Sequence, residues 1–452
     1  MSDAVREPRE RRRAASPPVT SPEFSRSIDA IWRIEFPRLV AGLTRLTRDV
    51  GRAEDLAQDA LVAALEHWPR TGVPERPGAW LMATAKRRAI DQLRRAKMLD
   101  RKHEQLGREL DERPDTHAAE RDAGLDDDFG DDLLRLMFMT CHPVLSSESR
   151  VALTLRLLGG LTAEEIARAF LAQVPTIEQR IVRAKRTLGE ARVPFEVPRG
   201  ADRAERLGSV LGVLYLVFNE GYSATRGDDW LRPALCDDAL RLGRVLAELA
   251  PEEPEVHGLV ALMELTSSRA RARVTADGEP VLLLEQDRAR WDQLLIRRGL
   301  AALARAEALG GARGQFALQG AIAACHARAR TAAETDWARI VALYDALASL
   351  VPSPVVELNR AVAVAMAFGP AAGLELVDAL ANEPSLAGYH LLPAARGDLL
   401  SRLGRHDEAR TEFARAASLT RNAREQKVLL DRAARSGIEP DQVPGPGPET
   451  MH

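Results

Sequence analysis

Apolar residues recur at the spacing of a helix face along most of the chain, and few segments alternate between apolar and polar residues as strands do. The pattern predicts helices over residues 24–99, 133–192 and 201–436, with Pro- and Gly-rich breaks at 69–78 and 194–200. Aromatic residues make up only 4% of the composition, whereas Ala, Leu and Arg, which favour helices, are abundant. We therefore expect an all-α protein.

Length and local composition divide this helical chain into several parts. With 452 residues it exceeds one typical core, so about two to four domains are expected. Residues 100–132 are acidic and poor in apolar residues, which is typical of a flexible linker. The predicted order is a disordered basic tail (1–23), a helical domain (24–99), the acidic linker (100–132), a second helical domain (133–195), a C-terminal helical domain (201–436) and a disordered tail (437–452).

Residues 79–96 are predicted to form an amphipathic helix with a strongly cationic surface. Its apolar positions recur near the helical period and are Trp80, Leu81, Ala85, Ile90 and Leu93. Its cationic positions, with the residue that follows the helix, are Lys86, Arg87, Arg88, Arg94, Arg95 and Lys97. Arginine keeps its charge and suits phosphate, which favours nucleic acid as the ligand. A solvated basic face is the alternative, and the helix alone does not decide between them.

Residues 162–188 have the pattern of two short helices joined by a turn. Thr162 suits an N-cap and Glu165 completes a capping box, so the first helix is predicted over 163–170. Pro175 suits the start of the second helix. The apolar stripe of that helix is predicted to be Ile177, Ile181, Ala184 and Leu188, which leaves a surface rich in Arg and Gln. This favours a helix-turn-helix that reads DNA, with a plain helical hairpin as the alternative.

Residues 52–68 are predicted to form another amphipathic helix, with an acidic side. The positions expected to face a core are Leu56, Ala60, Ala63, Ala64 and Trp68. The polar side consists of Glu54, Asp55, Gln58, Asp59 and Glu66. This side is either a solvated face or a surface that docks on another protein.

Neither a metal site, a cofactor site nor a membrane span is predicted. The cysteines Cys141, Cys236 and Cys325 lack metal-ligand spacing, and their odd number argues against a disulfide framework. No apolar run reaches the length of a membrane helix, and the N-terminus lacks the apolar core of a signal peptide, so a cytoplasmic location is expected. The sequence contains no P-loop, nucleophile elbow or zinc-protease motif, so we do not expect an enzyme.

Two polar motifs interrupt the C-terminal helical domain. Asp237 and Asp238 are expected on a helix surface or near a helix N-terminus rather than in acid–base chemistry. The motif 219–222 (Asn-Glu-Gly-Tyr) follows the apolar run 210–218. We expect a buried turn or an interdomain contact there, with a ligand site as the alternative.

The C-terminal third shows a weak repeat of paired helices. Gly369 and Gly404 lie 35 residues apart, close to the period of a tetratricopeptide unit. Gly397 and Phe413 fit the small and gap-filling positions of one unit, because small residues let paired helices approach. An earlier unit would end with Trp337, Tyr344, Leu347 and Pro352. The repeat predicts a tetratricopeptide-like domain.

The order of these motifs resembles that of the extracytoplasmic-function (ECF) sigma factors of bacterial RNA polymerase. Segments 36–39, 53–65 and 77–95 resemble the sigma-two domain, and 145–188 resembles the sigma-four domain with its helix-turn-helix. A subgroup of this family carries a helical C-terminal extension with tetratricopeptide-like units. Segments 218–225, 235–242 and 352–364 resemble that extension. The resemblance implies two small helical sigma domains on a flexible linker, followed by the helical C-terminal domain.

The resemblance also implies partners and site residues. The partners are core RNA polymerase, through its β′ coiled coil and β flap, and promoter DNA, with an unknown protein partner for the C-terminal domain and no membrane. Polymerase docking is implied for Asp55, Gln58, Asp59 and Trp68. Contacts with the −10 element are implied for Lys86, Arg87, Arg88, Asp91, Gln92, Arg94 and Arg95. Contacts with the −35 element are implied for Thr176, Gln179, Arg180, Arg183, Lys185 and Arg186.

The loop 69–78 would capture a flipped base of the −10 element, although it lacks an aromatic platform for that base. The main hypothesis is therefore a sigma factor that binds core polymerase, directs promoter recognition and transcription initiation, and is regulated in cis by its C-terminal helical domain. One alternative is a DNA-binding regulator or adaptor with a tetratricopeptide-like interaction domain that does not act as a sigma factor. A second is an enzyme within residues 201–436, which nothing in the sequence demands.

Overall fold

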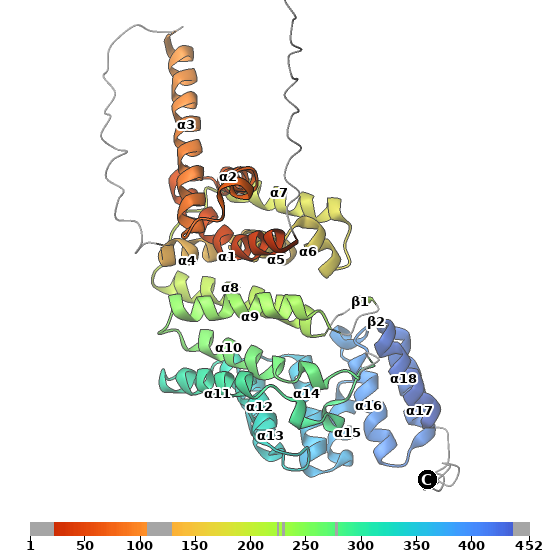
Figure 1. Cartoon of the computed structure of the whole chain (residues 1–452). Helices are drawn as coiled ribbons and strands as arrows, with labels where there is room; N and C mark the ends of the chain where they lie inside the picture. The colour runs from red at the N-terminus through yellow and green to blue at the C-terminus, as the bar shows by residue number, and fades with distance from the viewer. Residues whose placement is uncertain (1–21, 106–128, 224–225, 228–230, 276–278, 437–452) are drawn as a thin grey trace, which may run out of the picture. The chain divides into compact units, whose positions relative to one another are not determined.

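The computed structural model describes residues 22–105, 129–223, 226–227, 231–275 and 279–436, and these residues are mostly helical (Figure 1). The expectation of an all-α protein is confirmed, since the strands of the described part have two residues each. Apart from residues 22 and 23, which begin the first helix, the predicted tails lie outside the described residues, as do linker residues 106–128. The chain divides into two compact units, residues 1–133 and 134–452.

Three helices form the first unit: α1 (Pro22–Thr47), α2 (Val50–Thr71) and α3 (Pro77–Gln105). Asp49 caps α2 by accepting hydrogen bonds from the backbone of Gly51 and Arg52. The core includes Phe36, Leu39, Val40, Leu43, Leu56, Ala57, Ala60, Ala64, Trp68, Leu81, Met82, Ala85 and Ala89. The break between α2 and α3 is shorter than predicted, because α2 continues past Pro69 to Thr71 and is capped by Gly72, whose φ is 82°.

The second unit begins within α4 (Phe129–Thr140), which is followed by α5 (Ser147–Leu157), α6 (Ala163–Ala169) and α7 (Val174–Glu190). The capping box predicted from the sequence is present: Glu165 N–H donates to Thr162 Oγ1 at 3.1 Å, and Thr162 N–H donates to Glu165 Oε2 at 2.8 Å. The predicted stripe of α7 is buried against α5 and α6. The two-helix pattern of the sequence therefore folds as a helix-turn-helix.

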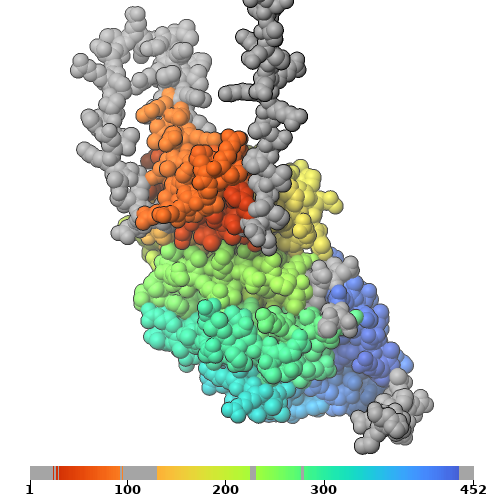
Figure 2. Space-filling model, viewed as in Figure 1, coloured from red at the N-terminus to blue at the C-terminus, as the bar shows by residue number. Residues whose placement is uncertain are grey.

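A series of antiparallel helices makes up the remainder of the second unit. Its helices are α8 (Ala201–Tyr222), α9 (Pro233–Leu249), α10 (Pro254–Ser267), α11 (Gln293–Ala308), α12 (Gln315–Arg328), α13 (Trp337–Leu350), α14 (Pro354–Phe368), α15 (Pro370–Ala379), α16 (Leu391–Arg402), α17 (His406–Leu419) and α18 (Ala423–Arg435). Short 3-10 turns lie at Ala270–Ala272, Leu283–Glu285, Arg288–Arg290 and Pro384–Leu386. In the space-filling view these helices form a continuous body from green to blue (Figure 2). We call α8–α18 the C-terminal helical region.

The glycines of the predicted repeat lie where paired helices turn or approach. Gly369 (φ 102°) separates α14 from α15, and Gly404 (φ 75°) separates α16 from α17, so both positions suit glycine. A Cβ on Gly397 of α16 would lie 3.0 Å from the Phe413 ring of α17. The small residue therefore lets Phe413 fill the space between the two helices, as the repeat predicts.

The two ends of the C-terminal helical region meet. Strand β1 (Arg226–Gly227), which follows α8, pairs in parallel with β2 (Arg421–Asn422), which precedes α18. Lys427 of α18 also forms a 2.7 Å ion pair with Glu279. The strand pairing connects segments almost two hundred positions apart and the ion pair segments 148 positions apart, so the helical series closes on itself rather than remaining an open array.

Candidate nucleic-acid interface

Helix α7 presents a polar face opposite its buried stripe. Thr176, Gln179, Arg183 and Arg186 are exposed, and the helical period places them along one side. Arg186 also lies 3.5 Å from Glu190 in an exposed ion pair, which is too weak to withdraw it from solvent. The helix therefore offers hydroxyl, amide and guanidinium groups together, and these groups can bond to base edges and phosphates in a major groove.

Arg180 and Lys185 differ from the other sequence-predicted residues of α7. Arg180 lies at the edge of the polar face, is half-buried and approaches Glu148 at the start of α5. A hydrogen bond from its own backbone chiefly lowers the pKa of Glu148, and the charge of Arg180 adds to this effect. Lys185 falls beyond the buried stripe, on the other flank of the helix. Arg180 thus lies beside the exposed face that contains Arg183, and Lys185 lies on a different side of the helix.

The basic helix α3 has a corresponding face in the first unit. Arg87, Asp91 and Arg94 are exposed and follow the i, i+4, i+7 spacing of one helix side, whereas Lys86 is half-buried. Arg88 turns toward α2, where its Nη1 donates to the Asp59 carbonyl at 2.7 Å. The side chains of Gln92 and Arg95 lie outside the described part of the structure.

The acidic side of α2 is smaller than its periodicity predicts. Asp55 and Asp59 are exposed one turn apart, and Gln58 beside them is half-buried. Glu54, which the sequence pattern places on this side, is instead only 2% exposed, and its carboxylate accepts a 2.9 Å hydrogen bond from Gln58 Nε2. The exposed charge of this face is therefore carried by Asp55 and Asp59, with Glu66 further along the helix.

Trp68, which the resemblance implies in polymerase docking, lies in the core of the first unit. Its side chain is only 2% exposed, and its ring meets that of Trp80 edge-on at a centroid distance of 5.4 Å. Trp80 in turn stacks on His67 at 5.8 Å. These aromatic contacts join the end of α2 to the start of α3 across the short loop, so the two helices are held together where the loop begins and ends. The loop itself contributes no aromatic side chain.

The C-terminal helical region packs directly on the helix-turn-helix domain within the second unit. Helix α8 contacts α5. Arg206 Nη2 donates to the Phe138 carbonyl at 3.1 Å, and Ser209 Oγ donates to the Cys141 carbonyl at 2.6 Å. Arg241 Nη2 of α9 donates to the Leu158 carbonyl at 3.2 Å. These bonds use carbonyls at the ends of α4 and α5, and they leave the polar face of α7 exposed.

The polar motif at residues 219–222 takes part in this contact. It forms the last turn of α8, so it is a helix end rather than a separate turn. Glu220 is bonded to Arg232, which also donates to the Ala169 carbonyl at the end of α6. Arg273 lies over the Tyr222 ring at 3.7 Å. The motif is therefore linked to the helix-turn-helix domain through Arg232, which sequence reasoning did not identify.

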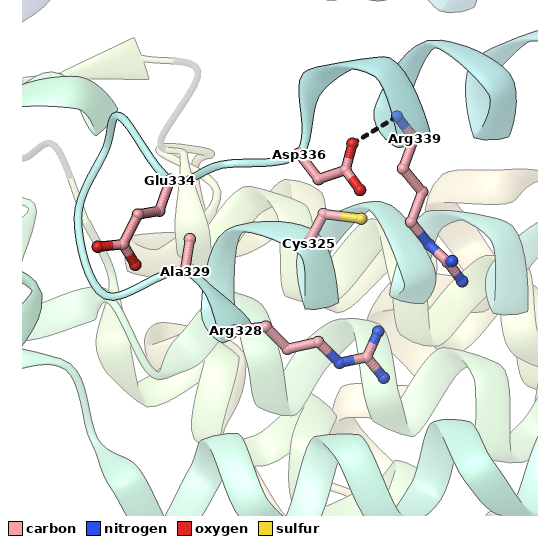
Figure 3. Close-up of a pocket in the computed structure, with 6 residues that line it drawn as sticks. All are labelled: Cys325, Arg328, Ala329, Glu334, Asp336 and Arg339. Atoms are coloured by element: carbon pink, nitrogen blue, oxygen red, sulfur yellow. Dashed lines mark hydrogen bonds between the residues drawn. The ribbon is translucent and has the colours of Figure 1, made fainter.

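A small cavity in the C-terminal helical region has no catalytic arrangement. It has a volume of about 350 Å³ and lies between α12 and α13, and its lining is Cys325, Arg328, Ala329, Glu334, Asp336 and Arg339 (Figure 3). Asp336 is engaged there, because its Oδ1 accepts from the Arg339 backbone N–H at 2.9 Å and caps α13. Burial raises the pKa of the Cys325 thiol, so the thiol remains protonated and is a weak nucleophile.

The described residues contain neither a disulfide nor a cluster suited to a metal ion. The three cysteines are free and buried, and no group of three or more His, Cys, Asp or Glu there could hold a metal ion. Asp237 and Asp238 lie on α9, where Asp238 is 3.6 Å from Arg241 and burial raises the pKa of Asp237. Within these residues, no helix is long and apolar enough to cross a membrane.

Comparison with known proteins finds three family regions along the chain. Residues 33–98 match the model of sigma-70 region 2, and residues 135–188 match that of sigma-70 region 4. Residues 206–307 match a family of unknown function, DUF6596. The helix-turn-helix and the basic helix thus lie within two regions that occur together in sigma factors. The chain belongs to the ECF sigma factors.

Full-length and partial relatives agree with this assignment. An uncharacterised protein of Rhizobium meliloti (strain 1021) is 44% identical over 408 residues, which cover 90% of this chain and 95% of the relative. The ECF RNA polymerase sigma factor SigK of Mycobacterium sp. (strain KMS) is 28% identical over 148 residues, which cover 32% of this chain and 72% of SigK. No solved structure matches the chain. The SigK match is confined to a third of this chain, and the first relative extends over nearly all of it.

The family assignment fixes the general activity. A sigma factor binds core RNA polymerase and promoter DNA and acts in transcription initiation, and the family is not enzymatic. This sigma factor carries a C-terminal extension, which includes the DUF6596 match and is mostly helical in its described residues. The expectation of a sigma factor with a helical extension is confirmed.

Proposed function

We propose that this sigma factor reads the −35 element with α7 and the −10 element with α3, and that its C-terminal helical region acts on promoter recognition in cis. The observation that carries the proposal is the position of the C-terminal helical region on α4 and α5. It contacts the helix-turn-helix domain through α8 and α9 while Thr176, Gln179 and Arg183 stay exposed. The extension therefore acts on the domain without covering its reading face.

For the −10 element, α3 supplies the exposed side formed by Arg87, Asp91 and Arg94. The guanidinium groups bind phosphates, and Asp91 lies where it can accept a hydrogen bond from a base. Lys86, Arg88, Gln92 and Arg95 complete the proposed set. The loop between α2 and α3 is proposed to hold a flipped base of the −10 element. Its backbone and the polar residues Glu75 and Arg76 supply the groups for that contact.

For the polymerase, the exposed pair Asp55 and Asp59 on α2, with Gln58 beside them, is proposed to dock on the β′ coiled coil. Trp68, which is buried, belongs to the proposed docking helix as a core residue that holds the end of α2 against the start of α3. The helix-turn-helix domain is proposed to contact the β flap. This assigns the protein to the cytoplasm, where polymerase and chromosome are found. A protein partner that binds the C-terminal helical region would influence α7 indirectly, through the contact between α5 and α8.

Transcription with purified core polymerase tests the proposal. A library of genomic fragments serves as template, and sequencing of the transcripts identifies the promoters and their −10 and −35 elements. The full-length protein is compared with Ser209→Val, which removes the hydroxyl that donates to the Cys141 carbonyl and accepts from Arg150 in the contact between the C-terminal helical region and the helix-turn-helix domain. We expect specific transcripts from the full-length protein and an altered yield from the variant. No specific transcript from the wild type contradicts the function, and an unchanged yield contradicts action in cis.

A further inference from the structure

The turn between α6 and α7 has an unfavourable backbone conformation. Leu171 adopts φ 47°, in the left-handed region that glycine enters freely and residues with a side chain rarely do. Its side chain is 50% exposed, so burial does not compensate for this conformation. Two backbone hydrogen bonds close the turn, from Leu171 to Arg168 at 3.4 Å and from Ala172 to Ala167 at 2.9 Å. A strained turn of this kind persists when its surroundings hold it in place.

Arg232 of the C-terminal helical region supplies such a contact. It is the residue before α9, and its Nη1 donates a hydrogen bond to the carbonyl of Ala169, the last residue of α6. The same nitrogen donates to Glu220 Oε1 in the last turn of α8. The Arg232 and Glu220 side chains are only 12% and 13% exposed, so this charge-assisted bonding is largely shielded from water.

The backbone around Arg232 is also fixed. Its N–H donates to the Gly221 carbonyl at 2.7 Å. Gly221 in turn lies so close to α9 that a Cβ there would approach the Cys236 backbone nitrogen to 2.7 Å. The end of α8 and the start of α9 therefore form a tightly packed corner, and the Arg232 side chain extends from this corner to the end of α6.

We propose that Arg232 is a positioning residue for promoter recognition: held by Glu220, it fixes the turn between α6 and α7 and thereby the orientation of α7. This inference rests on the proposed reading of the −35 element by α7. Arg206, Ser209 and Arg241 bond instead to carbonyls at the ends of α4 and α5, which support the domain away from the turn. Arg232 acts on the segment that sets the direction of α7.

The consequence is specific to sequence reading. Contacts with base edges require the side chains at the start of α7 to be placed accurately, whereas non-specific affinity depends on the number of phosphate contacts. Loss of the Arg232 contact leaves the charges of α7 unchanged. It is therefore expected to weaken binding to the −35 element and to leave binding to unrelated DNA nearly constant.

Hydrogen exchange on the full-length protein tests the contact itself. Arg232→Met keeps most of the apolar stem and removes the donor. We expect amide exchange in residues 170–173 to accelerate about tenfold, the factor that corresponds to about 1.4 kcal/mol, because a charge-assisted hydrogen bond is lost. The matched control is Arg241→Met, which removes the bond to Leu158 and should leave exchange in the turn unchanged. Unchanged exchange in Arg232→Met overturns the proposal.

DNA binding tests the consequence. The probes are a duplex with the −35 element identified by transcription and a duplex of the same length with that element scrambled. Arg232→Met is expected to bind the first about tenfold more weakly and the second within about twofold of the wild type. Leu171→Gly introduced into the variant should restore much of the specific binding, because glycine adopts the turn conformation without strain. Equal weakening on both duplexes, or no rescue, contradicts a positioning role.

A second substitution covers the case in which Arg232→Met does not fold. Glu220→Gln keeps the side-chain size and weakens the hold on Arg232, so both effects should follow in the same direction and be smaller. If the wild type itself neither binds promoter duplexes nor supports transcription, the proposed function fails, and hydrogen exchange still decides whether Arg232 holds the turn. If the wild type binds and both variants match it, the positioning role alone fails.

Discussion

Arg88 of α3 donates a hydrogen bond from Nη1 to the Asp59 carbonyl of α2 at 2.7 Å, and the same nitrogen lies 3.5 Å from the Asp59 carboxylate. The family resemblance implies different partners for these two residues, DNA for Arg88 and polymerase for Asp59. In the structure the two residues contact each other. Because their side chains are 40% and 53% exposed, the ion pair contributes little to folding. Its effect is to connect the proposed docking helix with the helix proposed to read the −10 element.

The exposed face of α2 leads to a prediction about polymerase binding. Asp55→Arg reverses a charge on this face without touching the bond between Arg88 and Asp59. We expect affinity for core polymerase to fall about tenfold or more, since reversing the charge of a docking residue opposes the electrostatic complementarity of the proposed contact. Fluorescence titration with core polymerase measures the affinity, and the midpoint of thermal unfolding should stay within a few degrees of that of the wild type.

Glu307→Arg in α11 is the matched control for this substitution, because it makes the same charge change at an exposed position of the other unit. It is expected to leave polymerase affinity nearly unchanged. Equal polymerase affinities for Asp55→Arg and the wild type would show that this face of α2 is not part of the docking surface. A loss of affinity in both variants would indicate an effect of net charge.

The two arginines of the α7 face are predicted to differ in importance. Arg183→Ala is expected to cost about 1–3 kcal/mol of binding to the −35 duplex if its guanidinium contacts a base edge. Arg180→Ala should cost less, because Arg180 is half-buried and approaches Glu148. Lys185→Ala, on the other flank of the helix, is the control and should leave the promoter preference unchanged. Equilibrium binding to matched and scrambled duplexes measures all three, and an unaltered preference in Arg183→Ala contradicts the assignment.

Close packing between α8 and α9 predicts opposite effects for two glycine substitutions in one helix. Gly221→Ala places a Cβ 2.7 Å from the Cys236 backbone nitrogen, so the helices must shift, and we expect a net loss of about 1–3 kcal/mol. Gly208→Ala meets no atom within 4 Å and should stabilise α8 by about 0.5–1 kcal/mol through helix propensity. Urea unfolding followed by circular dichroism measures both. Similar stabilities for the two variants would contradict this account of Gly221.

His326, near the end of α12, predicts a pH dependence of stability. Burial, with the charges of Arg269 and Arg288, lowers its pKa from 6.5 to about 3. The unfolded chain therefore binds more protons than the folded protein between these values, and the stability that His326 contributes above pH 6.5 is lost as the pH falls toward 3. His326→Phe keeps a ring against Trp337. It should lose less stability than the wild type between about pH 7 and pH 5 in urea unfolding, and an equal loss contradicts the prediction.

Much of the local structure follows from the sequence. The helical period gives the buried stripe of α7, and the residues Thr162 and Glu165 give the start of α6, because both features depend on neighbours within one or two turns. The order of the basic helix and the helix-turn-helix is likewise contained in the sequence, and it carried the resemblance to sigma factors. The turn glycines Gly369 and Gly404 follow from the repeat for the same reason.

Tertiary structure determined which polar side chains are buried and which groups they bond to. The period of α2 places Glu54 with the acidic residues, yet packing buries it to 2% exposure and pairs it with Gln58. The bond between Arg232 and Ala169 spans 63 positions, and that between Arg88 and Asp59 spans 29. Such pairings arise when separate helices pack, and no local pattern specifies which arginine meets which carbonyl. The sequence therefore determined the helices and the class of the protein, and their packing determined which charges face solvent.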